Sequence, residues 1–90
     1  MKDTEEKFVA IRGVDVVRAV SNLRSHGKIT EKLTAKNYKK YADLIGKSVY
    51  KDMLEFCDEH ENIKPVSEQE CIDRTSGLVR YLAVRNRLPE

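Results

Sequence analysis

The sequence predicts an all-α fold, a compact array of four to five short helices in a single small domain spanning residues 1–90. Apolar residues recur with the period of amphipathic helices along most of the chain. A capping box, Ser67-x-x-Glu70, indicates where one helix begins. Glycine or proline separates the periodic segments, at Gly13, Gly27, Gly46 and Pro65. With 90 residues, 40% of them hydrophobic, the chain can form one small core but no deep enclosed substrate cavity.

The first helix is expected from about Val14 to Ser25. Its apolar face would be formed by Val16, Val17, Val20 and Leu23. The preceding run, Phe8-Val-Ala-Ile11, is short and rich in residues that favour strands. We favour a helical extension there, and a short N-terminal strand is the alternative.

A second helix is predicted from Thr34, as its N-cap, to Gly46, which can take the left-handed conformation that closes a helix. Ser48 is the expected cap of a third helix that ends near Asn62. Apolar residues continue at helical spacing through Val49, Met53, Phe56 and Cys57. Two short helices meeting at Gly46 predict a helical corner, with a helix-turn-helix at about residues 34–61.

The fourth helix has the strongest local signals. Ser67 and Glu70 form the capping box, and Val66 and Cys71 occupy the two positions of a hydrophobic staple. Leu88-Pro89 is expected to end the helix. Its predicted buried stripe contains Cys71, Thr75, Leu78 and Leu82, with Ile72 and Val79 beside them.

The net charge of +2 conceals a segregation along the chain. Residues 28–51 carry seven basic and two acidic side chains (+5), residues 52–73 carry one and eight (−7), and residues 74–90 carry four and one (+3). In one interpretation the acidic and basic blocks face each other or simply solvate their own helices, and in the other the basic block forms a patch for an anionic partner. Both interpretations are open from the sequence.

The segment Tyr41-Ala-Asp-Leu-Ile-Gly-Lys-Ser48 resembles the turn region of small phage excisionase and Cox-type regulators. This resemblance implies a DNA-binding regulator of transcription, encoded by a phage or mobile element and acting as a dimer without a cofactor. In the usual pattern, apolar residues of the second helix would fall on Lys47, Asp52 and Glu55, which are polar. A turn one residue longer puts Met53 and Phe56 inward.

If this motif binds duplex DNA, some side chains would face the groove and others would contact phosphates. The expected groove residues are Lys47, Ser48, Tyr50 and Lys51, and the expected phosphate contacts are Lys36, Lys39 and Lys40. Tyr50 lies off the apolar stripe, so we expect it to be an exposed aromatic contact.

The alternative function is a protein–protein interaction module that docks on a larger host enzyme or polymerase and inhibits or redirects it. The expected docking face is acidic and contains Asp52, Glu55, Asp58 and Glu59. The same face suits the lysine block of a second copy, so a homodimer is compatible with the sequence.

Enzymatic and metal-binding functions have little support in the sequence. Cys57, His60, Cys71 and His26 are zinc-ligand types, but their spacing matches no common zinc motif. A Cys57/His60 catalytic pair would lack a group to orient the imidazole. We therefore expect no catalytic residue, no metal and no cofactor. The acidic start of the chain and the absence of a long apolar run indicate a cytoplasmic protein that does not enter a membrane.

Overall fold

The computed structural model describes residues 7–89. Its elements, in chain order, are β1 (Lys7–Phe8), α1 (Gly13–Ser25), α2 (Tyr38–Glu59), β2 (Ile63–Lys64) and α3 (Glu68–Val84). The all-α prediction is confirmed, but the predicted number of helices is wrong, because the described residues form three. The acidic start at residues 1–6, on which the expectation of a cytoplasmic protein partly depends, lies outside the described residues.

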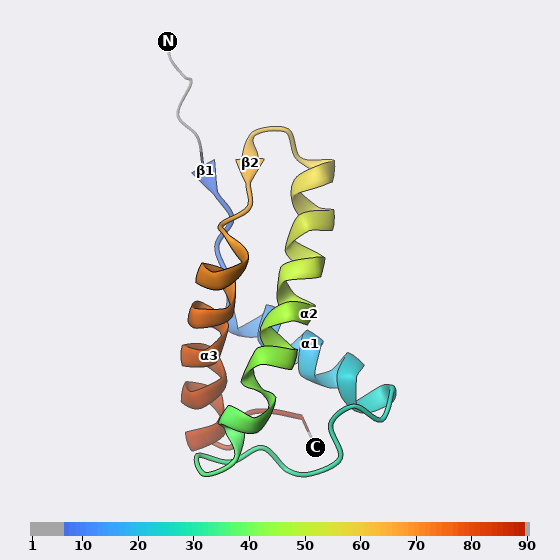
Figure 1. Cartoon of the computed structure of the whole chain (residues 1–90), viewed down its shortest axis with the longest axis vertical. Coiled ribbons are helices and arrows are strands. Elements are labelled where there is room, and N and C mark those ends of the chain that lie inside the picture. Colours follow the sequence, from blue (N-terminus) through green and yellow to red (C-terminus); the bar gives the residue numbers. More distant parts are fainter. Residues whose placement is uncertain (1–6, 90) are drawn as a thin grey trace.

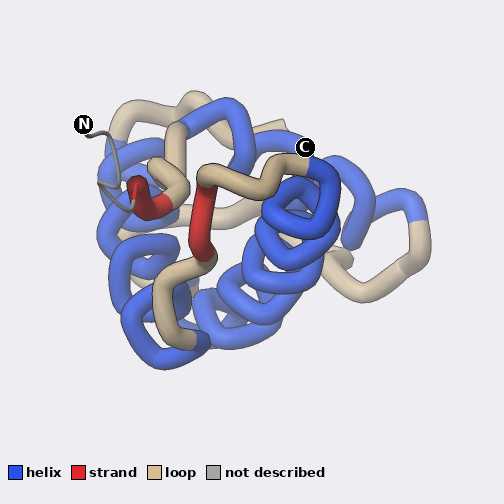
Figure 2. Tube along the Cα trace, turned by 90° about the horizontal axis from the view of Figure 1, so that it is seen from above, coloured by secondary structure: helices blue, strands red, loops and turns tan. Residues whose placement is uncertain are grey.

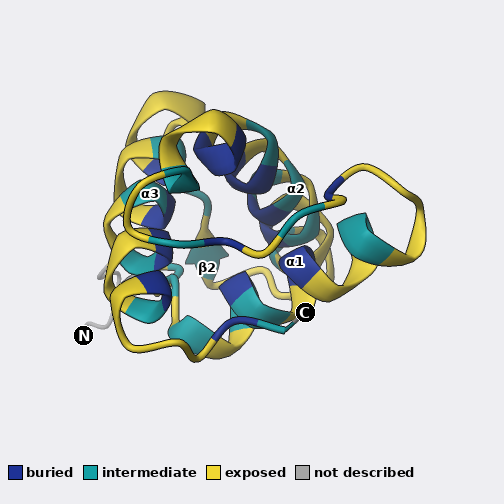
Figure 3. Ribbon diagram, turned by 90° about the horizontal axis from the view of Figure 1, so that it is seen from below, coloured by how far each residue is buried: buried dark blue, intermediate teal, exposed yellow. Residues whose placement is uncertain are grey.

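The helices pack as an antiparallel pair with a third helix across it (Figure 1). α2 and α3 lie side by side and run in opposite directions, and the shorter α1 packs against both. Buried residues occupy the facing sides of the three helices (Figure 3). The centre of this core is formed by Val16, Val20, Ile45, Cys71, Thr75 and Val79, which are fully buried.

α2 is one continuous helix, so the predicted corner at Gly46 and the helix-turn-helix at residues 34–61 are wrong. Gly46 is buried inside α2, where a Cβ atom would lie 3.0 Å from the Cα atom of Ile72. The glycine therefore permits the close approach of α3, and it does not close a helix. Ser48 lies within α2 and caps no helix.

The start of α2 also differs from the prediction. The helix begins at Tyr38 with Asn37 as its N-cap, whereas Thr34 was the predicted cap. The Thr34 hydroxyl instead accepts hydrogen bonds from the backbone N–H groups of Lys36 (3.2 Å) and Asn37 (3.3 Å). Thr34 therefore stabilises the turn that leads into α2.

The Phe8–Ile11 segment is extended, which corrects the preference for a helix there. β1 pairs in parallel with β2, with Lys7 opposite Ile63 and Phe8 opposite Lys64. The Val9 N–H donates to the Lys64 carbonyl at 3.0 Å and prolongs the pairing by one hydrogen bond. Figure 2 shows the two strands next to each other at one end of the molecule.

The predictions for α1 and for the start of α3 are confirmed. α1 begins one residue before the expected start, where the Arg12 N–H donates to the Asp15 carboxylate at 2.9 Å. At α3, the Ser67 hydroxyl accepts from the Glu70 N–H at 3.2 Å, as the capping box predicts. Val66 is buried, as the staple requires.

α3 ends at Val84, before the predicted Leu88-Pro89. Asn86 has a positive φ of 56°, the Asn86 N–H bonds to the Ala83 carbonyl, and the Arg87 N–H bonds to the Leu82 carbonyl. This is a Schellman motif, in which asparagine takes the left-handed position. The buried face of α3 is also shifted from the predicted one and contains Cys71, Thr75, Val79 and Ala83.

Arg24, near the end of α1, holds two distant parts of the chain. Its guanidinium donates to the carbonyl of Pro89 at 2.7 Å and to that of Glu31 at 2.8 Å. Leu88, the residue before Pro89, is buried. The loop before α2 and the segment after α3 are therefore both fixed to α1. Among residues 7–89, no helix combines the length and the apolar character needed to span a bilayer.

Candidate binding surfaces

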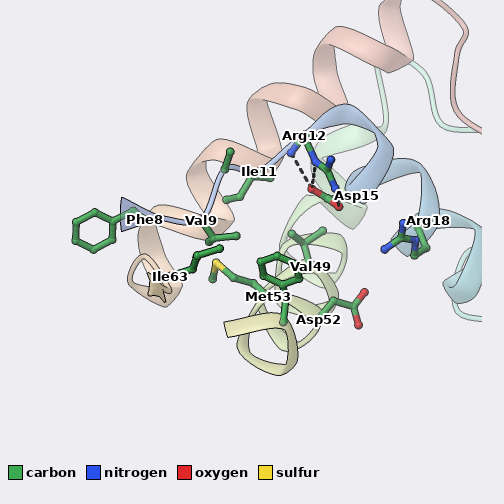
Figure 4. Close-up of a pocket in the computed structure, with 12 residues that line it drawn as sticks. Phe8, Val9, Ile11, Arg12, Asp15, Arg18, Val49, Asp52, Met53 and Ile63 are labelled. Atoms are coloured by element: carbon green, nitrogen blue, oxygen red, sulfur yellow. Dashed lines mark hydrogen bonds and ion pairs between the residues drawn. The ribbon is translucent and has the colours of Figure 1, made fainter. Parts of the chain in front are cut away.

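An apolar groove lies between the C-terminal half of α2 and the extended segment from β1 to the start of α1 (Figure 4). Its volume is about 570 Å³. The larger apolar side chains that line it are Phe8, Val9, Ile11, Val49, Met53, Phe56 and Ile63. Figure 1 shows why the groove is open. The C-terminal part of α2 continues past the start of α3, and within residues 7–89 only the two short strands lie alongside it there.

Two aromatic rings of the groove are exposed to an unusual degree for large apolar side chains. Phe8 is 61% exposed and Phe56 is 42% exposed. Phe56 was expected to point inward, but the lack of a helix over this part of α2 leaves it at the surface. Its ring stacks on the His60 imidazole with 4.1 Å between centroids. Clustered exposed apolar groups of this kind mark binding surfaces more often than single ones do.

Charged residues border the groove. At its α1 end, Arg12 and Asp15 form an ion pair at 3.4 Å (Figure 4). Arg18 and Asp52 also line the groove. Asp52 is half-buried and begins a helical stripe that continues through the exposed Glu55 and Glu59, at i, i+3 and i+7.

The structure therefore brings three of the four predicted acidic residues, Asp52, Glu55 and Glu59, to one side of α2 next to the groove. Asp58 is exposed three residues beyond Glu55, which places it further round the helix from Asp52 and the groove. Sequence reasoning identified this acidic face but missed the groove beside it. The run Phe8–Ile11 was the only signal, as a candidate strand.

The predicted DNA-binding residues are spread over more than one side of α2. Lys39, Lys40, Lys47 and Lys51 are exposed on the helix, and Lys36 is exposed in the turn before it. Ser48 and Tyr50 are half-buried. Tyr50 packs against the core cluster, so it is not the freely exposed aromatic that the sequence predicts.

Lys40 is paired with an acidic residue from the loop before α2. Its Nζ lies 2.8 Å from the Glu31 carboxylate, which also accepts hydrogen bonds from the Tyr41 hydroxyl (2.6 Å) and the Asn37 amide (3.1 Å). These three hydrogen bonds, with that from Lys40 the strongest, lower the pKa of Glu31 to about 2. The carboxylate in turn raises the pKa values of Lys40 and Tyr41. The charges of Lys40 and Glu31 therefore largely cancel, so Lys40 adds little to the positive charge of the other lysines of α2.

The fold places basic residues together at one end of the molecule and acidic residues together at the other. Because α2 and α3 are antiparallel, the basic start of α2 and the basic end of α3 lie at the same end of the molecule (Figure 1). We call this end the basic pole, which contains Lys36, Lys39, Arg80, Arg85 and Arg87. The opposite end, the acidic pole, contains Asp52, Glu55, Asp58, Glu59 and Glu61. Parts of the two basic blocks of the sequence thus lie together at one end, and the acidic residues of α2 do not face them.

The cysteines and histidines considered as metal ligands lie in different environments. Cys71 is fully buried, and its Sγ lies 3.8 Å from the Gly46 carbonyl oxygen. Cys57 is half-buried, and burial raises the pKa values of both thiols. His26 contacts the Asn22 carbonyl at 2.7 Å. Within residues 7–89, no three His, Cys, Asp or Glu side chains are grouped so that they could hold a metal ion.

Comparison with known proteins gives no match: no protein-family model fits the chain, and neither a curated protein nor a solved structure is significantly similar to it.

Proposed function

We propose that this chain is a small non-enzymatic binding protein that takes up an apolar, positively charged segment of another protein in the groove beside α2. The observation that carries the proposal is the exposure of Phe56 in an apolar groove, with the exposed Phe8 ring at the outer end of the groove (Figure 4). Burying exposed aromatic surface is favourable by roughly 25 cal/mol per Å², and aromatic side chains often dominate the energy of an interface.

The chemistry of the segment follows from the rim of the groove. The acidic stripe of Asp52, Glu55 and Glu59 runs along one edge and favours lysine or arginine on the partner. An amphipathic helix with apolar residues at i, i+3, i+4 and i+7 is a common occupant of such grooves. The acidic face and the groove would then act as one surface, with apolar contacts for affinity and charges for orientation.

A designed basic amphipathic peptide provides a direct test, with its affinity for the full chain measured by calorimetry. We expect Phe56→Gln to weaken binding by about tenfold or more, because Phe56 lines the groove. Leu54→Gln is the matched control. Leu54 lies on the same helix and is 40% exposed, compared with 42% for Phe56, but it does not line the groove. Equal effects of the two changes, or no binding by the unmodified chain, would contradict the proposal.

Duplex DNA is the second candidate partner, and the basic pole is the observation that favours it. Lys36 and Lys39 lie at the same end of the molecule as Arg80 and Arg85, although no helix-turn-helix is present in the described residues. Such a surface would contact phosphates without reading base sequence. The proposed regulator would then act by coating or bridging DNA, and its affinity would depend strongly on salt.

A further inference from the structure

Gly77 lies in the middle of α3, where nothing inside the described part of the chain requires a glycine. A Cβ atom at this position would meet no other atom within 4 Å. Glycine in a helix interior costs about 1 kcal/mol relative to alanine. Gly46 shows the contrasting case, because there the missing side chain admits the backbone of α3. The absence of a side chain at Gly77 therefore suits a close contact made from outside.

The surface around Gly77 has the character of an unoccupied binding face. Tyr81 is 52% exposed and Val84 is 57% exposed, and both lie on the same side of α3 as Gly77. Together with Arg80 and Arg85 they line a shallow hollow of about 380 Å³ over the glycine. The guanidinium of Arg85 lies 3.9 Å from the centroid of the Tyr81 ring, which holds the ring against the helix. We call this surface the outer face of α3.

The outer face of α3 has the properties that the groove requires of its ligand. It is a helix surface with two exposed apolar side chains, Tyr81 and Val84, and it carries Arg80 and Arg85 beside them. The groove offers exposed aromatic side chains, and its edge along α2, from Asp52 through Glu55 to Glu59, is acidic. The outer face of α3 is therefore complementary to the groove in both apolar character and charge, and the same chain carries both surfaces.

We infer that the outer face of α3 docks in the groove of a second copy of this chain. The inference rests on the proposed function, since it names the segment that the groove takes up. Tyr81 and Val84 enter the groove against Phe56 and Met53, while Gly77 allows the α3 backbone to approach its rim. Arg80 and Arg85 then face the acidic stripe of the other copy.

The contact joins two different surfaces, so it is heterologous. Each copy offers one outer face and one groove, and the assembly either closes into a ring, including a dimer with two such contacts, or extends as a chain. An exposed charged contact of this kind should weaken as salt is added.

The first experiment measures the mass of the full chain by sedimentation from about 10 μM to about 1 mM, the range in which weak contacts become populated. We expect the mass to rise with concentration and to fall with salt. Gly77→Gln should keep the chain monomeric without lowering its melting temperature, because the new side chain fills open space within the molecule but blocks the docking face. Ser21→Gln is the control on the exposed side of α1 and should assemble like the unmodified chain.

The second experiment separates the two surfaces by charge reversal. We expect Glu55→Lys with Glu59→Lys, and separately Arg80→Glu with Arg85→Glu, to be monomeric alone, because each retains only one of the two complementary surfaces. An equimolar mixture should assemble again, since the outer face of the first variant meets the acidic groove of the second, and the two reversed surfaces also carry opposite charges. An unmodified chain that stays monomeric at every concentration, or a Gly77→Gln variant that assembles normally, would overturn the inference.

The same variants distinguish this inference from the proposed function. The Arg80→Glu, Arg85→Glu variant keeps its groove, so binding of the designed peptide to it while the unmodified chain remains monomeric would overturn self-docking alone. Self-association that persists in Phe56→Gln would place the contact outside the groove and overturn it as well. If Gly77→Gln loses duplex DNA binding but not self-association, the outer face serves nucleic acid, and the inference is again overturned.

Discussion

At the scale of single residues, Thr75 is a buried polar group with an unusual environment. It lies on the fully buried face of α3, and its hydroxyl has no oxygen or nitrogen hydrogen-bond partner among the described residues, with only a weak interaction with the Cys71 thiol one turn earlier. A buried hydroxyl that leaves water without gaining a partner costs about 1 to 3 kcal/mol. Valine has the same shape without the hydroxyl and a similar helix propensity.

We therefore expect Thr75→Val to raise the free energy of unfolding by about 1 kcal/mol, which is about 4 to 8 °C in melting temperature for a domain of this size. Urea denaturation and thermal melting would measure the change. Thr75→Ala is the control, because it also removes the methyl group and should destabilise the core. A Val variant less stable than the unmodified chain would show that the hydroxyl has a partner in solution.

The lysines show how a residue's neighbours in the fold change which contacts it is available to make. In the sequence, Lys36, Lys39 and Lys40 look equivalent as phosphate contacts. In the structure, Lys40 donates to Glu31 at 2.8 Å, together with Tyr41. Glu31 precedes Lys40 by nine residues, a separation at which spacing along a helix predicts no contact. Only the path of the loop before α2 brings the two charges together.

At the scale of helices, the two internal glycines have opposite roles. Gly46 is buried at the contact of α2 with α3, and Gly77 faces open space. Substitution by alanine should raise helix propensity by about 1 kcal/mol at both sites. At Gly46, the new Cβ would also lie 3.0 Å from the Ile72 Cα atom, so the backbone of one helix must shift. Overpacking of this kind costs about 1 to 3 kcal/mol.

Gly46→Ala is thus expected to destabilise the protein by up to about 2 kcal/mol, since the steric cost exceeds the gain in propensity. Gly77→Ala should instead stabilise it by about 0.5 to 1 kcal/mol. Thermal melts of the two variants under identical conditions test both values. Stabilisation by Gly46→Ala would show that α3 does not approach α2 as closely as the structure has it.

At the scale of the whole molecule, the antiparallel packing of α2 and α3 decides where charge accumulates. The sequence contains two basic blocks separated by an acidic one. The fold places parts of both basic blocks at one end and the acidic residues of α2 at the other (Figure 1). The potential at each pole is therefore larger than the net charge of +2 suggests, and it governs encounters with charged partners.

If the basic pole binds duplex DNA, affinity should fall steeply with salt, and removing one phosphate-binding lysine should reduce the log–log slope by about 0.9. We expect Lys36→Ala and Lys39→Ala to show this reduction in a fluorescence anisotropy titration. Lys40→Ala is the matched control and should have a smaller effect, because Glu31 already neutralises that lysine. A chain that fails to bind DNA at about 50 mM salt would eliminate this second candidate.

The sequence by itself determined the helical class, the extent of α1 and the start of α3. These features depend on interactions within about one helical turn, such as the hydrogen bond from the Glu70 N–H to Ser67. Only the tertiary structure decided that α2 continues through Gly46, because the reason is the packing of Ile72 from another helix. The groove and the two poles have the same origin: Phe8 and Phe56 lie far apart in the chain, and their shared exposure follows from where the other helices end.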